Sequence, residues 1–244
     1  MTDKEIKLSP VEKLKTESRF LRGTIADELS NELPNFDGDS VQILKHHGMY
    51  QQDDRDQRMA MRAKGIKDKA FMMMLRTRIP GGKLTSEQML AEIALADELG
   101  NTTLRLTTRQ AIQLHGIYKS DLKEVIRRTN EVQMSTLGAC GDVNRNVMCC
   151  PAPFKNKIYD DIQAMADTVS EHFLPRTSAY HELWLSNPET GEKELVGGGI
   201  DGHEIEPIYG TTYLPRKFKT AIGLTYDNCI DIYTNDLGLL AIVE

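Results

Sequence analysis

An alternation of strand and helix patterns between residues 71 and 132 constrains the fold of this chain more than any other feature. FMMMLRTR (71–78) is strand-like and is stopped by a Pro-Gly-Gly turn. Apolar residues at helical spacing follow, and two more strand patterns, 102–108 and 111–118, precede a second helix. The order strand, helix, strand, strand, helix is most of a ferredoxin-like split βαβ unit. The sequence therefore predicts an α+β fold that contains a ferredoxin-like half-domain.

Local signals mark where the two helices begin and end. Thr85 and Gln88 have the spacing of a capping box, which predicts the start of the first helix. Gly100 lies just past the expected end of that helix. Ser120 is the expected cap of the second helix, over 121–132. We expect the half-domain to span residues 71–136.

The segments on either side of the half-domain have other patterns. Residues 1–70 look helical and polar, and we expect them to form an N-terminal arm that supports the main domain. Residues 137–244 are expected to be the first part of a larger mixed α/β domain. The elements expected there are a helix at 160–173, strands at 181–186, 216–226, 229–233 and 238–243, and a hairpin or loop at 187–206. The last strand stops almost at Glu244, which indicates a cut chain.

Composition limits the classes of function. The net charge of −6 argues against general nucleic-acid binding, because the neutralisation of phosphates needs a basic field. No apolar run reaches the length of a membrane span and the start of the chain is charged, so we expect a cytoplasmic protein without membrane contact. The spacing of Cys140, Cys149, Cys150 and Cys229 gives neither a disulfide framework nor a zinc site and indicates reduced thiols.

Cationic residues occupy alternating positions on several of the expected strands. Arg76 and Arg78 are two residues apart, as are Lys217 and Lys219, so each pair is expected to share one face of a strand. Like charges about 4 Å apart repel by roughly 4 kcal/mol at an effective dielectric constant of 20. A polyanion between them would reverse the sign of that interaction. Further candidates lie elsewhere: Arg105 is on the strand expected at 102–108, Arg109 is in the turn to the next strand, which carries Gln113 and His115, and Arg145 stands between two asparagines.

Each of these residues also has a plainer structural interpretation. A single arginine or lysine on a strand usually points to solvent, and the paired cations would also suit the protection of an edge strand. His115 alone is more often a structural histidine than a ligand. The spacing of the residues by itself predicts an anion-binding α+β domain and nothing narrower.

Five segments resemble the siroheme sulfite and nitrite reductase family. They occur in the order of that family, cover the chain from about Val11 onward, and in combination are highly specific: LKHHGMYQQDDRDQR, FMMMLRTRIPGGKLT, TLRLTTRQAIQLHG, STLGACGDVNRNVMCCPAP and YLPRKFKTAIG. In that family siroheme lies between two related halves of each monomer. The resemblance implies that residues 137–244 begin the domain that binds siroheme and substrate.

The resemblance also implies roles for particular residues. Arg78, Arg145, Lys217 and Lys219 match the catalytic residues at the substrate site. The residues matching those that bind siroheme and its carboxylates are Arg76, Arg105, Thr107, Arg109, Gln113, His115 and Asn144. The implied reaction is the six-electron reduction of sulfite to sulfide in sulfur assimilation. Two lysines beside two arginines favour sulfite over nitrite, because sulfite carries more charge on its oxygens and the related nitrite reductases do not keep both lysines.

The half of the family that carries the cluster cysteines is missing from this sequence. The chain is thus expected to hold no metal ligand of its own and to need a C-terminal half that brings a [4Fe–4S] cluster. Ferredoxin is the favoured electron donor, with another donor left open. The alternatives are a ferredoxin-dependent nitrite reductase and a non-catalytic, ferredoxin-like fragment that binds a polyanion.

Overall fold

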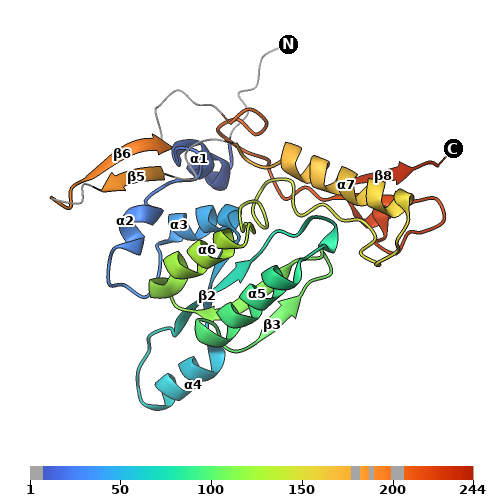
Figure 1. The fold of residues 1–244 in the computed structure, drawn as a ribbon. Helices are drawn as coiled ribbons and strands as arrows, with labels where there is room; N and C mark the ends of the chain where they lie inside the picture. The colour runs from blue at the N-terminus through green and yellow to red at the C-terminus, as the bar shows by residue number, and fades with distance from the viewer. Residues whose placement is uncertain (1–7, 177–181, 187–189, 199–205, 244) are drawn as a thin grey trace, which may run out of the picture.

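A four-stranded antiparallel sheet forms the centre of the computed structural model (Figure 1). The structure describes residues 8–176, 182–186, 190–198 and 206–243. The order of strands is β1-β2-β4-β3, and their bounds are β1 Met49–Asp53, β2 Phe71–Arg76, β3 Leu104–Leu106 and β4 Ile112–Ile117. All neighbouring pairs are antiparallel. The predicted α+β class and ferredoxin-like half-domain are confirmed, because β2, α5, β3, β4 and α6 follow one another as expected.

Two helices cover one face of this sheet. They are α5 (Ser86–Glu98) and α6 (Leu122–Glu131). The expected capping box of α5 is present, since the Thr85 side chain accepts from the Gln88 backbone N–H at 3.1 Å and the Gln88 side chain accepts from the Thr85 N–H at 3.0 Å. The expected Ser120 cap is wrong: Asp121 precedes α6 without a side-chain cap, and residues Lys119–Asp121 form the 3₁₀ turn η3.

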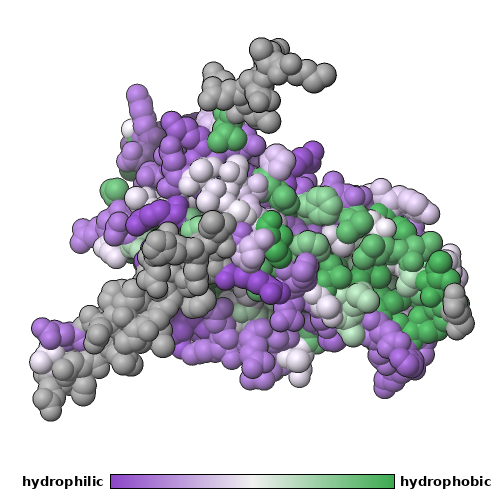
Figure 2. Space-filling model, turned by 90° about the horizontal axis from the view of Figure 1, so that it is seen from above, coloured by the Kyte–Doolittle hydropathy of each residue, from purple (hydrophilic) through white to green (hydrophobic). Residues whose placement is uncertain are grey.

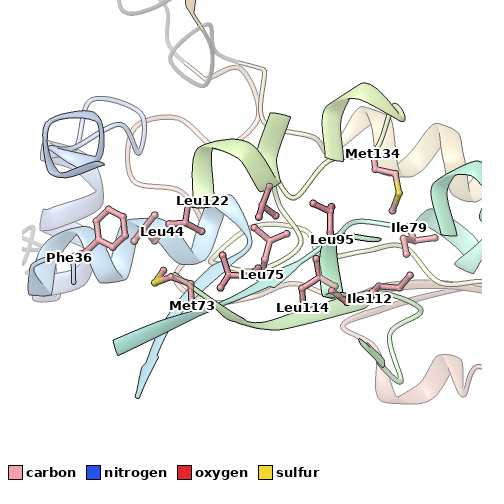
Figure 3. Packing of buried hydrophobic residues seen from close by; sticks show 13 residues of the cluster. Phe36, Leu44, Met73, Leu75, Ile79, Leu95, Ile112, Leu114, Leu122 and Met134 are labelled. Carbon is pink, nitrogen blue, oxygen red and sulfur yellow. The ribbon is translucent and has the colours of Figure 1, made fainter. Parts of the chain in front are cut away.

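The core lies between the sheet and these helices (Figure 3). Met73 and Leu75 of β2 and Leu114 of β4 point toward Leu95 of α5 and Leu122 of α6. Because strand side chains alternate, the intervening residues of β2 and β4 lie on the opposite face. That opposite face, which we call the polar face, carries three of the candidate residues, Arg76, Gln113 and His115, beside Met72 and Met74.

The N-terminal segment contains a strand that the sequence did not predict. Residues 1–70 were expected to be helical, and most of the elements there are short helices: α1 Pro10–Glu17, α2 Ile25–Leu29, α3 Gly38–Leu44, η1 Lys45–His47 and α4 Arg55–Ala63. Strand β1, however, pairs with β2 along its whole length. The division at residue 70 stays a prediction, but this segment supplies one edge of the sheet.

In the C-terminal part, the strands that pack against α7 pair in parallel. Helix α7 (Lys157–His172) packs on β7 (Thr220–Leu224), and β7 pairs in parallel with β8 (Leu237–Ala241). On its other edge β7 meets an extended segment through parallel bridges at Asn144–Phe218 and Met148–Ala221. Met148 N–H donates to Thr220 O at 3.1 Å, and Ile222 N–H donates to Met148 O at 2.8 Å. We call residues 144–148 the NRN segment.

Two other expectations for this part need correction or qualification. Residues 229–233 were expected to be a strand, but the 3₁₀ turn η5 (Ile232–Thr234) lies there because Asn228 accepts from the Ile232 N–H and Asp231 has a left-handed backbone. Strand β5 (Glu182–Ser186) lies where a strand was expected at 181–186, and it forms an antiparallel hairpin with β6 (Lys193–Gly198), which lies in the segment expected to be a hairpin or loop. Residues 187–189 and 199–205 of that prediction lie outside the described residues.

Candidate functional site

A cavity of about 690 Å³ lies between the polar face of the sheet and the NRN segment. Five cationic side chains line it, and they come from four separate stretches of the chain: Arg76, Arg109, Arg145, Lys217 and Lys219. Asp231 is the one carboxylate in the lining that the structure describes. The imbalance of charge predicts that the cavity takes anions.

Backbone pairing places Arg145 beside the two lysines. Arg145 N–H donates to Phe218 O at 2.8 Å, so Arg145 lies next to the Lys217–Lys219 stretch. These lysines were expected on a strand, but β7 begins at Thr220 and they occupy the extended residues just before it. The Lys219 ammonium donates to Thr234 O at 2.9 Å, and the Arg145 Nε donates to Gly141 O at 2.7 Å. The pairing of the backbone therefore fixes where these three charges stand.

Arg109 is held at the cavity wall by backbone and side-chain acceptors. It donates to Asn146 O at 2.9 Å and also reaches the Asn235 side chain. Burial, and then the positive charge of Arg145, lower the pKa of Arg109 to about 10. Such a shift means that it costs free energy to keep Arg109 positively charged in the cavity. An anion between the guanidinium groups of Arg109 and Arg145 would offset that cost.

The polar face of the sheet continues the site beyond the cavity lining. Arg76 is opposite Gln113 in the strand register, and Arg105 is opposite Gln113 from the other side. The Gln113 side-chain oxygen accepts from Arg76 Nε at 3.0 Å, and Arg76 also donates to Cys140 Sγ at 3.0 Å. Arg105 and Arg76 therefore lie on either side of Gln113, on neighbouring strands of the sheet.

His115 lies on the same face. Its Nδ1 is 3.1 Å from the side-chain oxygen of Gln52 on β1, and its buried Nε2 has no hydrogen-bond partner among the described residues. Burial and the positive charges of Arg105 and Arg76 lower the pKa of this imidazole. The buried ring nitrogen is consequently available to a bound group.

The structure brings together only part of the expected site. Thr107 lines the cavity along with the five cations, whereas Arg105, Gln113 and His115 lie beside it on the sheet. Arg78 is elsewhere: its Nε donates to Ser170 Oγ at 3.0 Å, and its side chain is buried against α7. The expectation that Arg78 shares this cavity is wrong for this structure.

Asn144 also differs from the expectation. Its side-chain oxygen accepts from Thr220 Oγ1 at 2.7 Å, and its side-chain NH₂ donates to Arg145 O at 3.2 Å. The residue is buried and bonds the NRN segment to β7. It supports the site from behind the cavity.

Sequence reasoning missed Asn146, which organises one wall of the cavity. Its side-chain NH₂ donates to Ile79 O, Arg109 O and Gln110 O at 2.6–3.1 Å, and its oxygen accepts from the Ile79 N–H. The position of Asn146 next to the candidate Arg145 was the one sequence feature that could have pointed to it. Asp231 and Thr234 also line the cavity, but no pattern in the sequence marked them.

The fold and the site together define an α+β protein with a cationic cavity between a ferredoxin-like sheet and a parallel β segment. Residues 64–132 match the nitrite/sulfite reductase ferredoxin-like half domain, and residues 140–244 match the nitrite and sulphite reductase 4Fe-4S domain. The chain belongs to the nitrite and sulfite reductase family. The resemblance seen in the sequence is confirmed.

The relatives of known name are subunits of sulfite reductases. The chain is 48% identical over 238 residues to the "Sulfite reductase [NADPH] hemoprotein beta-component" of Myxococcus xanthus. The matched region covers 97% of this chain and 40% of that protein. The chain is 47% identical over 234 residues to the protein of the same name from Thiocapsa roseopersicina, covering 96% and 40%. The chain spans about 40% of the length of these curated relatives.

Solved structures show the same fold at low sequence identity. The NirA protein of Mycobacterium tuberculosis superimposes with a TM-score of 0.67 at 18% identity, covering 97% of this chain and 38% of that one. Dissimilatory sulfite reductase I gives a TM-score of 0.50 at 16% identity, covering 97% and 51%. Within the described residues, the structure has no helix long and apolar enough to cross a membrane.

Proposed function

We propose that this chain is the N-terminal part of an assimilatory sulfite reductase hemoprotein that reduces sulfite to sulfide with six electrons. The observation that carries the proposal is the cationic cavity, which gathers five positive side chains around one carboxylate. The names of the relatives support sulfite as the substrate. Nitrite is the alternative substrate, because the family includes nitrite reductases.

The residues present fit a macrocycle that carries several carboxylates. Arg76 and Arg109 line the cavity and Arg105 lies on the adjoining face of the sheet, all as potential donors to carboxylates. When bound, siroheme supplies the redox chemistry, with electrons delivered through a [4Fe–4S] cluster. Two of the four cysteine thiols here, Cys140 and Cys149, are buried apart, so we propose that the rest of the enzyme supplies the cluster ligands.

The chain's own residues would bind the oxyanion and supply protons. We assign Arg145 to holding the oxygens of sulfite, because a guanidinium keeps its charge while a substrate gains electrons. Lys217 and Lys219 are assigned to proton delivery from their ammonium groups. Thr107 and Gln113 orient neighbouring groups. Arg78 and Asn144 are assigned to positioning, since each bonds one part of the domain to another.

The electron donor of the complete enzyme is proposed to be a separate NADPH-linked component. The relatives are named as NADPH-dependent β-components, which favours such a partner over the ferredoxin that the sequence suggested. Ferredoxin stays a prediction that donor-exchange assays can test. The cytoplasm is the proposed compartment, because four free cysteines suit a reducing environment.

A chimera tests the proposed function. Residues 1–244 would replace the matching segment of the Myxococcus xanthus relative, and the purified protein would be assayed for its haem spectrum and for turnover of sulfite and nitrite. Lys217→Met is expected to lower sulfide formation by about 100-fold or more with the haem spectrum retained, since loss of a general acid costs 10²–10⁴-fold. Arg109→Gln is expected to weaken haem retention by roughly 10-fold or more.

Exposed cations away from the cavity provide the matched control. Arg127→Gln on α6 removes a cation that pairs with Glu124 on the surface, so spectrum and turnover should stay at the level of the unmodified chimera. Full turnover in Lys217→Met, or equal losses in the Arg127 control, would contradict the assignment. Faster turnover of nitrite than of sulfite would favour the alternative substrate.

A further inference from the structure

Three metal-ligating groups converge at one end of β7. The ligand atoms of Cys150, Asp227 and Cys229 all lie within 4.8 Å of one another. Spacing along the sequence gave no zinc motif, because Cys150 is distant from the other two residues. The parallel bridge between Met148 and Ala221 aligns the NRN segment with β7, and this places Cys150 beside the turn that follows the strand.

The carboxylate at the centre of this group is held by neighbouring donors. Tyr159 of α7 donates its hydroxyl hydrogen to Asp227 Oδ2 at 3.0 Å, and the Cys229 backbone N–H donates to Oδ1 at 3.1 Å. Outer hydrogen bonds of this kind orient metal-ligating carboxylates in known sites.

The other two cysteines are placed differently. Cys140 is buried and accepts from Arg76, whereas Cys149 is buried in the α7–β7 core and contacts Gln163. Neither belongs to the group of ligand atoms found among the described residues. A four-thiolate iron–sulfur cluster does not fit this group, since only two of the four sulfur atoms are there.

The chemistry of the three ligands selects the ion. Two thiols and one carboxylate suit Zn²⁺, which takes Cys and Asp ligands in tetrahedral geometry and can keep water in a fourth position. Mg²⁺ and Ca²⁺ prefer oxygen ligands throughout. We propose that Cys150, Asp227 and Cys229 form a binding site for Zn²⁺ at the rim of the cationic cavity.

Binding of Zn²⁺ would leave the net charge of the three ligands unchanged, so it would not add positive charge beside Lys217 and Lys219. Zn²⁺ replaces the two thiol protons, so two Zn–S bonds and one Zn–O bond form while two protons leave. The group carries one negative charge before binding, from the carboxylate, and one after binding. Cys229 also lines the cavity and is exposed, which gives the ion a path from solvent. The site is independent of the proposed reductase activity.

Cobalt binding tests the proposal on the reduced 244-residue chain. Co²⁺ is the probe because thiolate ligation produces a near-ultraviolet charge-transfer band and visible d–d bands. We expect one Co²⁺ per chain, displacement of Co²⁺ by Zn²⁺, and release of two protons per ion measured in a weakly buffered solution. Cys229→Ser changes an exposed residue and is expected to weaken binding by about 100-fold or more.

Matched variants separate the site from the other thiols. Tyr159→Phe should weaken binding by roughly 10-fold through loss of the outer hydrogen bond. Cys140→Ala and Cys149→Ala, at the two buried cysteines, should leave the affinity unchanged. Cobalt bands that persist in Cys229→Ser would overturn the proposal. Assembly of an iron–sulfur chromophore on Cys150 and Cys229 would also overturn it.

Discussion

Glu92 carries a carboxyl group into the hydrophobic core beneath the sheet. The residue lies on α5 and is 1% exposed, and neither carboxylate oxygen has a hydrogen-bond partner of ordinary geometry in the described part of the chain. Burial raises the pKa of this carboxyl to about 7, and neighbouring Thr77 offsets only part of that effect. At neutral pH the folded protein therefore keeps much of this group protonated, whereas the unfolded chain ionises it.

The raised pKa predicts how stability depends on pH. Its contribution to stability is full below the ordinary value of 4.5 and is lost as pH rises through about 7, because the folded state binds the extra proton. Glu92→Gln should remove this dependence and, relative to the wild type, gain on the order of 3 kcal/mol between pH 4.5 and 8. Urea unfolding at several pH values measures the difference.

Glu87→Gln is the control for that experiment, since Glu87 is exposed on the same helix. Its unfolding free energy should run parallel to that of the wild type from pH 4.5 to 8. A Glu92→Gln curve that also ran parallel would show that the buried carboxyl does not titrate in this range.

The cationic cavity could be predicted in part from single residues. Arg109, Arg145 and the two lysines were found because cations on strands and the family resemblance both marked them. Arg78 was misplaced because its partner, Ser170, is 92 residues away along the chain, and no local pattern reveals that hydrogen bond. Asn146 was missed because a buried amide is recognised only by the backbone groups around it.

At the scale of elements, local signals predicted structure well where the partners are close in sequence. The capping box of α5 involves residues three apart, and its prediction is confirmed. The strand expected at 229–233 is wrong because the side chain of Asn228 accepts from the Ile232 N–H and Asp231 has a left-handed backbone, which together turn the chain. Strand β1 was missed because its residues acquire extended structure by pairing with β2.

The cap of α5 gives a direct test of one element. Thr85→Ala removes the side-chain acceptor of the Gln88 N–H and should lower the free energy of unfolding by about 1 kcal/mol. Ser86→Ala, at the next and equally exposed position, should change it by less than about 0.5 kcal/mol. Urea titration of both variants measures these values, and equal losses would mean that the cap does not stabilise the helix.

At the scale of the whole molecule, apolar side chains gather at one end of the surface. Figure 2 shows this area on the side where α7, β7 and β8 lie in Figure 1. Exposed members include Met165 on α7, Leu239 and Leu240 on β8, and Ile242 just after it. Contiguous apolar patches on a protein surface usually mark contacts with other protein.

This surface predicts that the 244-residue chain self-associates when purified alone. Leu240→Lys combined with Ile242→Lys should raise the concentration at which self-association begins several-fold, because the charges disfavour contact between apolar strands. Sedimentation velocity measures the effect. Leu90→Lys, at a separate exposed leucine on α5, should leave self-association unchanged. If the Leu90→Lys variant changed self-association as much as the double variant, the added positive charge and not this surface would be responsible.

The hydrogen bonds between the NRN segment and β7 have a thermodynamic consequence. They hold Arg145 in place through the main chain, and its positive charge lies close enough to Arg109 to lower the pKa of that guanidinium, so this repulsion is present before any ligand arrives. An anion that enters relieves this stored repulsion and so binds the native state in preference to the unfolded chain. The free energy of unfolding must then rise with anion concentration, in proportion to its logarithm once the site is nearly saturated.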